Sequence, residues 1–322
     1  MHQDALTIMA PVNPARRPEV SRVLEEMQEN PSHNPVLPFG ALPGCHFGRI
    51  VLIPSSRGPS GEVLPDALLL ASDCDGSADD HLRALVDTAR DGLDRLFGAC
   101  DDYPTGQIGR NERLAFLAGK RLRPRAYYVH QQGRTVEQIE REEALRKQLQ
   151  AFVASHRLPS DSALGAREQI RAFIQKDPSL AWALEPAPRP GLAFRLREAI
   201  HHVSLPLGFA AVAPLAVPAT ALLLVLIRLM EARDASDDIR PSAATMRTLT
   251  ALEDHAANSG YTAAAFLKPG VVRELTVHAL LEFVGWGARH VFTRSSLAGV
   301  RTIHFARWNP VGGGRVEIIS NN

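Results

Sequence analysis

The sequence predicts an α+β protein in which two related split βαβ halves flank one long apolar segment. Three observations support this prediction. Strand-like and helix-like patterns alternate along residues 1–157. Motifs of that part recur about 255 residues later in the chain. Residues 203–227 carry no charged side chain.

The strands of the first half are short apolar runs bounded by Pro, Gly, Asn or Asp, which is the usual signature of a strand. They are expected at residues 6–12, 46–53, 67–72 and 125–130.

Helix signals separate these strands. Pro18 opens the first helix, where its missing N–H loses no hydrogen bond. Ser77 caps the second, which has apolar residues at helical spacing from Leu82 to Phe97. Thr135 caps a third, charged helix that reaches about residue 156. The order of elements is that of a ferredoxin-like fold with one extra helix.

The repeat is visible as a constant offset. Pro14 and Pro269 are 255 residues apart (269 − 14), and so are Glu19 and Glu274. Leu42-Pro-Gly and Leu297-Ala-Gly share this offset, whereas the two His-Phe-x-Arg motifs differ by 258 residues (304 − 46). A fixed period of this kind predicts an internal duplication.

The second copy is expected to be shorter than the first. It supplies strands at 261–267, 303–308 and 315–320 and a helix at 271–291, and the sequence stops at Asn322. A second helix and a last strand are therefore expected to be missing from this half.

Four parts follow from these patterns. Residues 1–157 form the first half, and residues 158–202 form a connector with a short helix near 166–175. Residues 203–230 form the apolar segment, and residues 245–322 form the second, incomplete half.

The apolar run 203–227 predicts a membrane helix. Its 25 residues exceed the roughly 20 that cross a hydrocarbon core. A buried helix of a soluble protein normally shows a polar stripe, which this run lacks. Two topologies remain open: a straight span, and a re-entrant hairpin that turns near Pro214. The straight span is favoured slightly, because lipid does not satisfy the backbone of an exposed turn.

Four segments carry a resemblance to a known group of proteins. LPGCHFGRIVLI, LLLASDCDGS, AYYVHQQGRTVEQIEREEALR and LAGVRTIHFARW resemble an uncharacterised bacterial family with two ferredoxin-like halves around a hydrophobic segment. The resemblance implies a bacterial inner-membrane location. More distantly, paired ferredoxin-like units are similar to the dimeric α+β barrel superfamily, which includes dye-decolourising peroxidases and chlorite dismutases. That similarity implies haem as an alternative cofactor, while no cofactor is predicted from the residues themselves.

His46 and Arg49, with their repeats His304 and Arg307, are the first candidate site residues. Strand alternation predicts that His46 and Arg49 point to opposite faces. A histidine inside a barrel can bind haem or a metal or carry protons. The competing interpretation, which we favour, is a hydrogen-bonded structural residue inherited by both copies.

Asp73 and Asp75 are the second candidates, in a DxDG run at the end of a strand. Such a run can bind a divalent cation or act as an acid. The simpler interpretation is a turn with acidic residues at a helix N-terminus, where the helix dipole favours them.

Composition narrows the function classes. The formal charge of +1 provides no field that attracts nucleic acid. Three cysteines without CxxC spacing argue against a disulfide framework and a thiolate metal site, and no metal site is predicted. The first hypothesis is a binding or scaffolding module on a lipid bilayer, with a protein partner or a homo-oligomer. The alternative is an oxidoreductase that uses a cavity between the halves, with haem.

Overall fold

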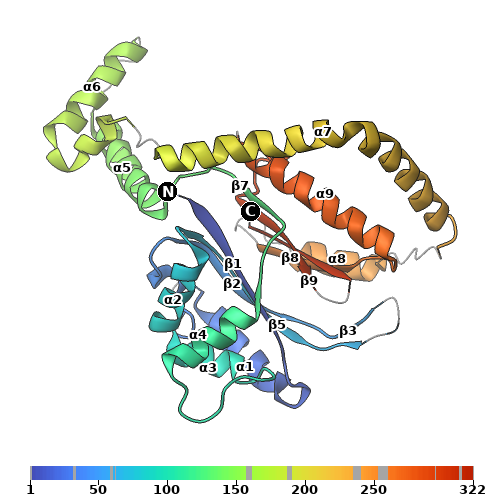
Figure 1. Cartoon of the computed structure of the whole chain (residues 1–322). Coiled ribbons are helices and arrows are strands. Elements are labelled where there is room, and N and C mark those ends of the chain that lie inside the picture. Colours follow the sequence, from blue (N-terminus) through green and yellow to red (C-terminus); the bar gives the residue numbers. More distant parts are fainter. Residues whose placement is uncertain are drawn as a thin grey trace. The chain divides into compact units, whose positions relative to one another are not determined.

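The computed structural model describes residues 2–31, 34–58, 61, 63–156, 162–186, 191–234, 241–252, 260–293, 295–311 and 314–321. Asn322 and parts of the expected connector, residues 158–161 and 187–190, lie outside them. The α+β prediction is confirmed: the described residues form antiparallel sheets and one long apolar helix (Figure 1). The chain divides into two compact units, residues 133–198 with Met1, and residues 2–132 together with 199–322.

The first four-stranded sheet has the order β2-β5-β1-β6. It consists of β1 (Gln3–Pro11), β2 (Cys45–Ile53), β5 (Ala67–Asp75) and the short β6 (Arg121–Leu122). Between β2 and β5, β3 (Ser56–Arg57) and β4 (Val63–Leu64) form a two-stranded ribbon. Side chains alternate across β1 and β5, so Leu6, Ile8, Leu68 and Leu70 all join the core under the helices.

Helices cover one face of this sheet. They are α1 (Arg17–Glu29), α2 (Ala78–Thr88), α3 (Arg90–Phe97) and α4 (Arg110–Gly119), with 3-10 turns η1 (Pro14–Arg16) and η2 (Phe39–Ala41). The single helix expected after Ser77 breaks at Ala89 into α2 and α3. A side chain on Gly92 of α3 would have its Cβ 1.7 Å from the carbonyl oxygen of Val36, so only glycine fits this contact.

The second four-stranded sheet has the order β7-β9-β10-β8. It consists of β7 (Ala126–Val129), β8 (Gly260–Phe266), β9 (Phe305–Val311) and β10 (Arg315–Asn321). Strands β9, β10 and β8 follow the same spatial order as β2, β5 and β1 in the first sheet.

The strand at 125–130 was expected to complete the first sheet, and this expectation is wrong. The place beside β1 is taken by β6, which pairs through Arg121 and Leu122. Strand β7 instead pairs with β9, with Ala126 opposite Trp308. This pairing buries Tyr128 in a small cluster with Ala288 and Ala306.

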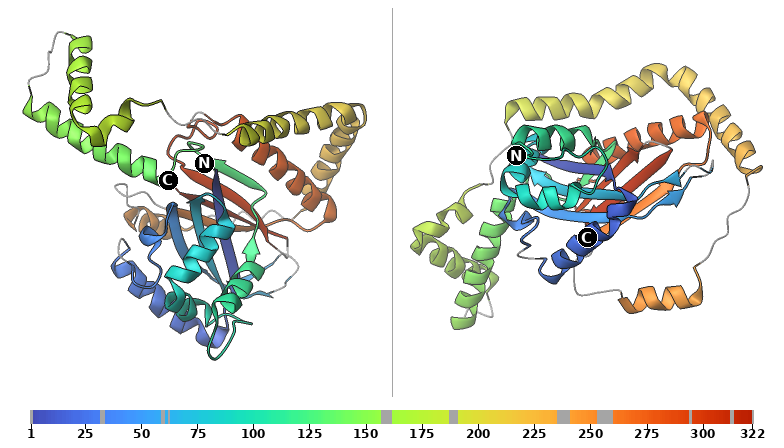
Figure 2. Two further views of the ribbon diagram at one scale, coloured as in Figure 1. Left: turned by 60° about the vertical axis from the view of Figure 1, so that its left-hand side comes forward. Right: turned by 90° about the horizontal axis from the view of Figure 1, so that it is seen from below.

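Two long helices lie in the sequence between β7 and β9. Helix α9 (Val271–His290) packs on β7, and Gly285 lies so near that an added Cβ would be 2.7 Å from the Arg125 carbonyl oxygen. Helix α7 (Leu192–Glu231) has 40 residues and is the one helix in the described part of the chain that is long and apolar enough to cross a membrane. It is bent, with three prolines inside it (Figure 1, Figure 2). The short α8 (Ala243–Leu252) precedes β8.

The unit of residues 133–198 is helical. Helix α5 (Val136–Ser155) begins at the predicted cap, Thr135, and α6 (Ala163–Lys176) is followed by η3 (Pro178–Leu184). Phe152 of α5 stacks on Phe173 of α6, with ring centroids 4.4 Å apart. No residue of α5 is fully buried.

A fragment of residues 245–322 is expected not to fold alone. It contains β8, β9, β10 and α9 but lacks β7, which comes from residues 126–129. Without β7 and the first sheet, the edge of β9, one side of α9 and the face of β9 and β10 that packs on the first sheet would face water. A fragment of this size then buries too little apolar surface to be stable alone. Thermal unfolding followed by circular dichroism should show no cooperative transition for the fragment. The full chain in the same detergent is the control, and a sharp reversible transition in the fragment would contradict the expectation.

Candidate functional site

A buried ion pair joins the two sheets. Asp73 lies on β5 and Arg307 on β9, and Nη2 of Arg307 is 2.8 Å from Oδ1 of Asp73. Tyr127 donates its hydroxyl to the same oxygen at 3.1 Å. Asn321 donates its amide to Oδ2 at 2.7 Å. The side chains of Asp73 and Arg307 are 0% and 1% exposed. Both carboxylate oxygens of Asp73 are thus bonded to protein donors in a buried site.

Two arginines reach across between the sheets in the same manner. Nη1 of Arg307 donates to Oγ1 of Thr7 on β1 at 3.0 Å. Nη1 of Arg49 on β2 donates to Oγ1 of Thr262 on β8 at 3.2 Å. Arg49 also donates to the carbonyl of Ser320 at 2.6 Å. Each sheet therefore contributes at least one arginine that bonds to the other sheet, and Arg315 of β10 also donates to the sulfur of Met9 on β1 at 3.3 Å.

His46 does not point away from the second sheet, so the expectation of opposite faces for His46 and Arg49 is wrong. Cys45 pairs with Cys74 and Phe47 with Asp73, which leaves His46 as the extra residue of a β-bulge. A bulge interrupts the alternation of side chains on which the expectation depends. The ring of His46 lies 5.2 Å from that of Phe305, and its Nε2 is 3.0 Å from Oδ1 of Asp75.

The repeated histidines are placed reciprocally. His304 lies beside Phe47, with ring centroids 6.0 Å apart, as His46 lies beside Phe305. The two phenylalanines contact each other edge to face at 5.7 Å. The six candidate residues thus gather at the meeting of the two sheets: His46 with Asp75, Asp73 with Arg307, and Arg49 and His304 beside them.

Burial dominates the electrostatics of this cluster. It raises the pKa of Asp73 above its ordinary value, and the guanidinium of Arg307 acts against that rise. Burial also lowers the pKa of Arg49 to about 10, with a further contribution from Arg307. The arrangement suits a structural ion pair, since both carboxylate oxygens of Asp73 are bonded to protein donors.

Three further polar residues on the same inter-sheet face had not been predicted. Glu317 and Arg315 of β10 form a 3.3 Å ion pair, and Asn309 of β9 lies opposite Glu317. Within the described residues, both amide atoms of Asn309 and Oε2 of Glu317 have no hydrogen-bond partner. Burial raises the pKa of Glu317. Alternating polar residues in 305–311 and 315–321 were the available sequence signal.

A buried serine–histidine pair lies on the other face of the first sheet. Oγ of Ser72 is 2.9 Å from Nε2 of His81 on α2. These residues are 0% and 4% exposed, so no substrate reaches the serine. Burial lowers the pKa of His81 to about 4, which keeps the ring neutral.

Among the residues that the structure describes, no cluster of three or more His, Cys, Asp or Glu is arranged to hold a metal ion. The three cysteines are free thiols, and burial raises the pKa of Cys45 and Cys100 to about 12. Thiols of this kind are poor nucleophiles at neutral pH.

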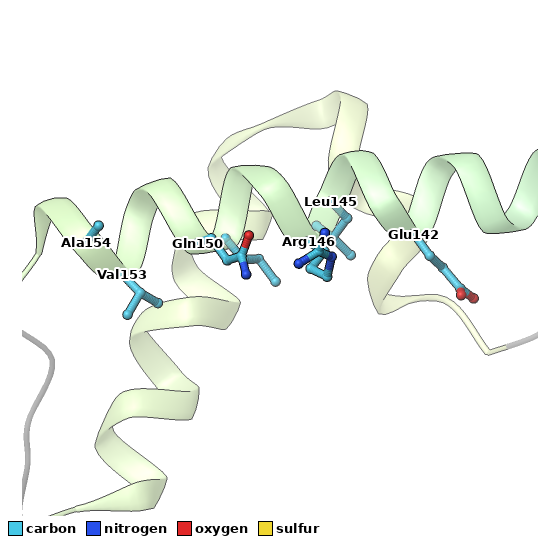
Figure 3. Close-up of a pocket in the computed structure, with 7 residues that line it drawn as sticks. Glu142, Leu145, Arg146, Gln150, Val153 and Ala154 are labelled. Carbon is cyan, nitrogen blue, oxygen red and sulfur yellow. The ribbon is translucent and has the colours of Figure 1, made fainter. Parts of the chain in front are cut away.

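A hollow of about 480 Å³ lies along α5 (Figure 3). Leu145, Leu149 and Val153 give it an apolar lining, beside Glu142, Arg146 and Gln150. The residues that line it come from one helix, and it contains no pair of groups suited to acid–base chemistry.

Comparison with known proteins assigns no function to this arrangement. No family model, no curated protein and no solved structure matches the chain. Function is therefore inferred from the geometry described above.

Replacing one partner of the inter-sheet pair should destabilise the protein strongly. Arg307→Met leaves Asp73 buried without its ion pair, a change that typically costs about 3–5 kcal/mol. The double variant Arg307→Met with Asp73→Leu should recover much of that loss. Denaturant unfolding of the wild type, Arg307→Met, Asp73→Leu and the double variant gives the coupling energy between the two side chains. Arg301→Met, at an exposed position, is the matched control. Purely additive losses would show that the pair does not link the sheets.

His81 should make the protein less stable in mild acid. The pKa in the folded chain is about 4 against 6.5 as the ordinary value, so the unfolded chain binds the proton first as the pH falls. The contribution of His81 to the free energy of unfolding is therefore fully present above pH 6.5. It is lost as the pH falls toward 4, and the loss is about 3 kcal/mol at about 1.36 kcal/mol per pKa unit. The midpoint of thermal unfolding of His81→Gln should depend less on pH in that window than the wild type. The exposed His156→Gln is the control, and equal slopes for all three proteins would refute the assignment.

Proposed function

We propose that this chain is a membrane-associated, non-enzymatic protein, whose two-sheet body is a binding or scaffolding module held at a bilayer by α7. The observation that carries the proposal is the surface of α7. Its most apolar 18-residue window has a mean hydropathy of 2.4, and none of that window is buried.

The exposed residues of α7 are large. Leu207, Leu215 and Leu222 are 65%, 78% and 61% exposed. On α9, Leu280 and Phe283 are also exposed, and Phe283 meets Phe209 of α7 with ring centroids 6.1 Å apart. Soluble monomers rarely leave continuous apolar surface of this kind in water, so a lipid environment accounts for it best.

We also propose that the two sheets descend from one duplicated ferredoxin-like unit. The common strand order supports this, and so do the reciprocal contacts. Thr7 and Thr262 are 255 residues apart (262 − 7), the offset of the sequence repeat, and each receives the arginine of the other half. On this view the inner faces serve mainly to bind each other, which favours a structural module over an enzyme.

The alternative function is a haem- or cavity-dependent oxidoreductase of the dimeric α+β barrel type. The unpaired polar atoms of Asn309 and Glu317 favour it, because a buried group without a partner costs about 1–3 kcal/mol unless water or a ligand satisfies it. The absorption spectrum and metal content of the full chain extracted in mild detergent separate the two. A Soret band supports the oxidoreductase, and a colourless protein without bound metal supports the module.

The membrane proposal predicts that the full chain floats with lipid vesicles in a density gradient. Leu215→Asp together with Leu222→Asp should leave it at the bottom. A charge placed in the middle of an apolar helix costs about 2.5–3.5 kcal/mol on insertion scales. Leu164→Asp is the matched control, because Leu164 is 72% exposed on α6 and lies outside α7. Wild-type protein that stays soluble without detergent and does not float with the vesicles would contradict the proposal.

A further inference from the structure

We infer that α7 enters one leaflet of the bilayer and returns to the side it came from, so that both sheets lie on the same face of the membrane. This inference rests on the membrane association proposed above. It concerns the path of the chain, which the apolar composition of α7 does not determine.

The first step is the pairing of residues on either side of α7 in the sequence. Asp73 precedes α7 and Arg307 follows it, yet they form a buried ion pair at 2.8 Å. Strand β7 also precedes α7 and forms its sheet with β9, which follows it. One continuous core cannot lie on both sides of a bilayer, so the chain crosses an even number of times or not at all.

The second step concerns a possible return crossing. Between α7 and β8 the chain contains residues 232–259, which include nine residues with Asp, Glu, Arg or His side chains. Helix α8, with 10 residues, would be about 15 Å long at 1.5 Å per residue, whereas a hydrocarbon core is about 30 Å thick. Among the described residues α7 is the one helix long and apolar enough to cross, so neither this stretch nor the part between β7 and α7 supplies a second span there. We therefore infer that α7 does not cross.

The third step comes from the contacts of α7 with α9. Near one end, Nδ1 of His201 is 2.6 Å from Nε2 of His290, and Trp286 donates to the carbonyl of His202 at 3.1 Å. Beyond the other end, Arg273 donates to Asp234 at 2.7 Å. Both ends of α7 are therefore held beside one helix of the second sheet.

The spacing of these contacts requires a bend. From residue 201 to 234 a straight helix would measure about 50 Å, whereas residues 273 to 290 of α9 measure about 26 Å, at 1.5 Å per residue. The middle of α7 must bow away from α9, and Figure 2 shows the bent helix. Pro214 and Pro218 lie near the midpoint of the longer stretch, where proline favours a kink.

The bend of α7 avoids the exposed backbone that a re-entrant hairpin would place in lipid. A hairpin that turns near Pro214 exposes backbone at the turn, which lipid does not satisfy, whereas α7 is one continuous helix through its three prolines. The only side chains of 203–227 that can form hydrogen bonds are Ser204 and Thr220. A protein partner would require a polar rim, so the acyl region of a single leaflet is the occupant that fits this surface.

The test measures sidedness with single cysteines. Asp91→Cys on α3 and Arg301→Cys, both at exposed positions, are each introduced into the full chain with Cys45, Cys74 and Cys100 changed to Ala. Sealed, uniformly oriented vesicles that contain the protein are treated with a membrane-impermeant maleimide before and after detergent. The two positions should label from the same side and to the same extent.

Two outcomes would overturn the inference. Labelling of one position only after detergent overturns it and leaves the membrane association intact. A chain that does not float with vesicles overturns both. If the cysteine-free chain is unstable, the two substitutions are made in the wild-type background and labelling is read by peptide mass spectrometry, because Cys74 and Cys100 are buried and peptide mapping separates Cys45 from the new sites.

Discussion

The ion pair between Asp73 and Arg307 is the constraint on which the arrangement of the two sheets depends. A buried pair of this type contributes little net stability compared with apolar side chains of similar size, but a mismatch that leaves one charge unpaired is severely penalised. It therefore selects among alternative packings. Sliding or turning one sheet against the other would separate Arg307 from both Asp73 and Thr7, and Arg49 from Thr262. Apolar contacts, such as Ile319 with Leu69 and Ala71, would tolerate many of those alternatives.

The packing of the two sheets against each other also limits which surfaces of the chain can bind other partners. Because the inner faces bind each other, the surfaces left for other partners are the helices outside the sheets. Because the core unites residues on both sides of α7 in the sequence, the membrane contact proposed for α7 requires that this helix leave and return on one side. Strand β7 strengthens the constraint, since it precedes α7 in the sequence and forms the edge of the second sheet beside β9, which follows α7.

Local features of this fold could be predicted from the sequence, and long-range ones could not. The helix after Thr135 and the strands at 46–53 and 315–320 follow from caps and from the spacing of apolar residues, which are local signals. The pairing of β7 with β9 depends on which sheet edge is free, and the short β6 that occupies the other edge gives almost no pattern. The bulge at His46 depends on the register between β2 and β5. Asp73 was predicted as a turn residue because β5 was expected to end at residue 72, whereas the strand continues to Asp75.

The proposed duplication also explains why the two halves are unequal at their meeting point. Ser72-Asp73 in the first half corresponds to Ser320-Asn321 in the second, and the side chains of Asp73 and Asn321 meet at 2.7 Å. Two carboxylates at this distance would repel each other, and one of them would have to be protonated in a site that already excludes water. An amide in one half converts that repulsion into a hydrogen bond and leaves Asp73 as the partner of Arg307. Two identical halves would meet here only with one carboxyl protonated, and the amide of Asn321 removes that requirement.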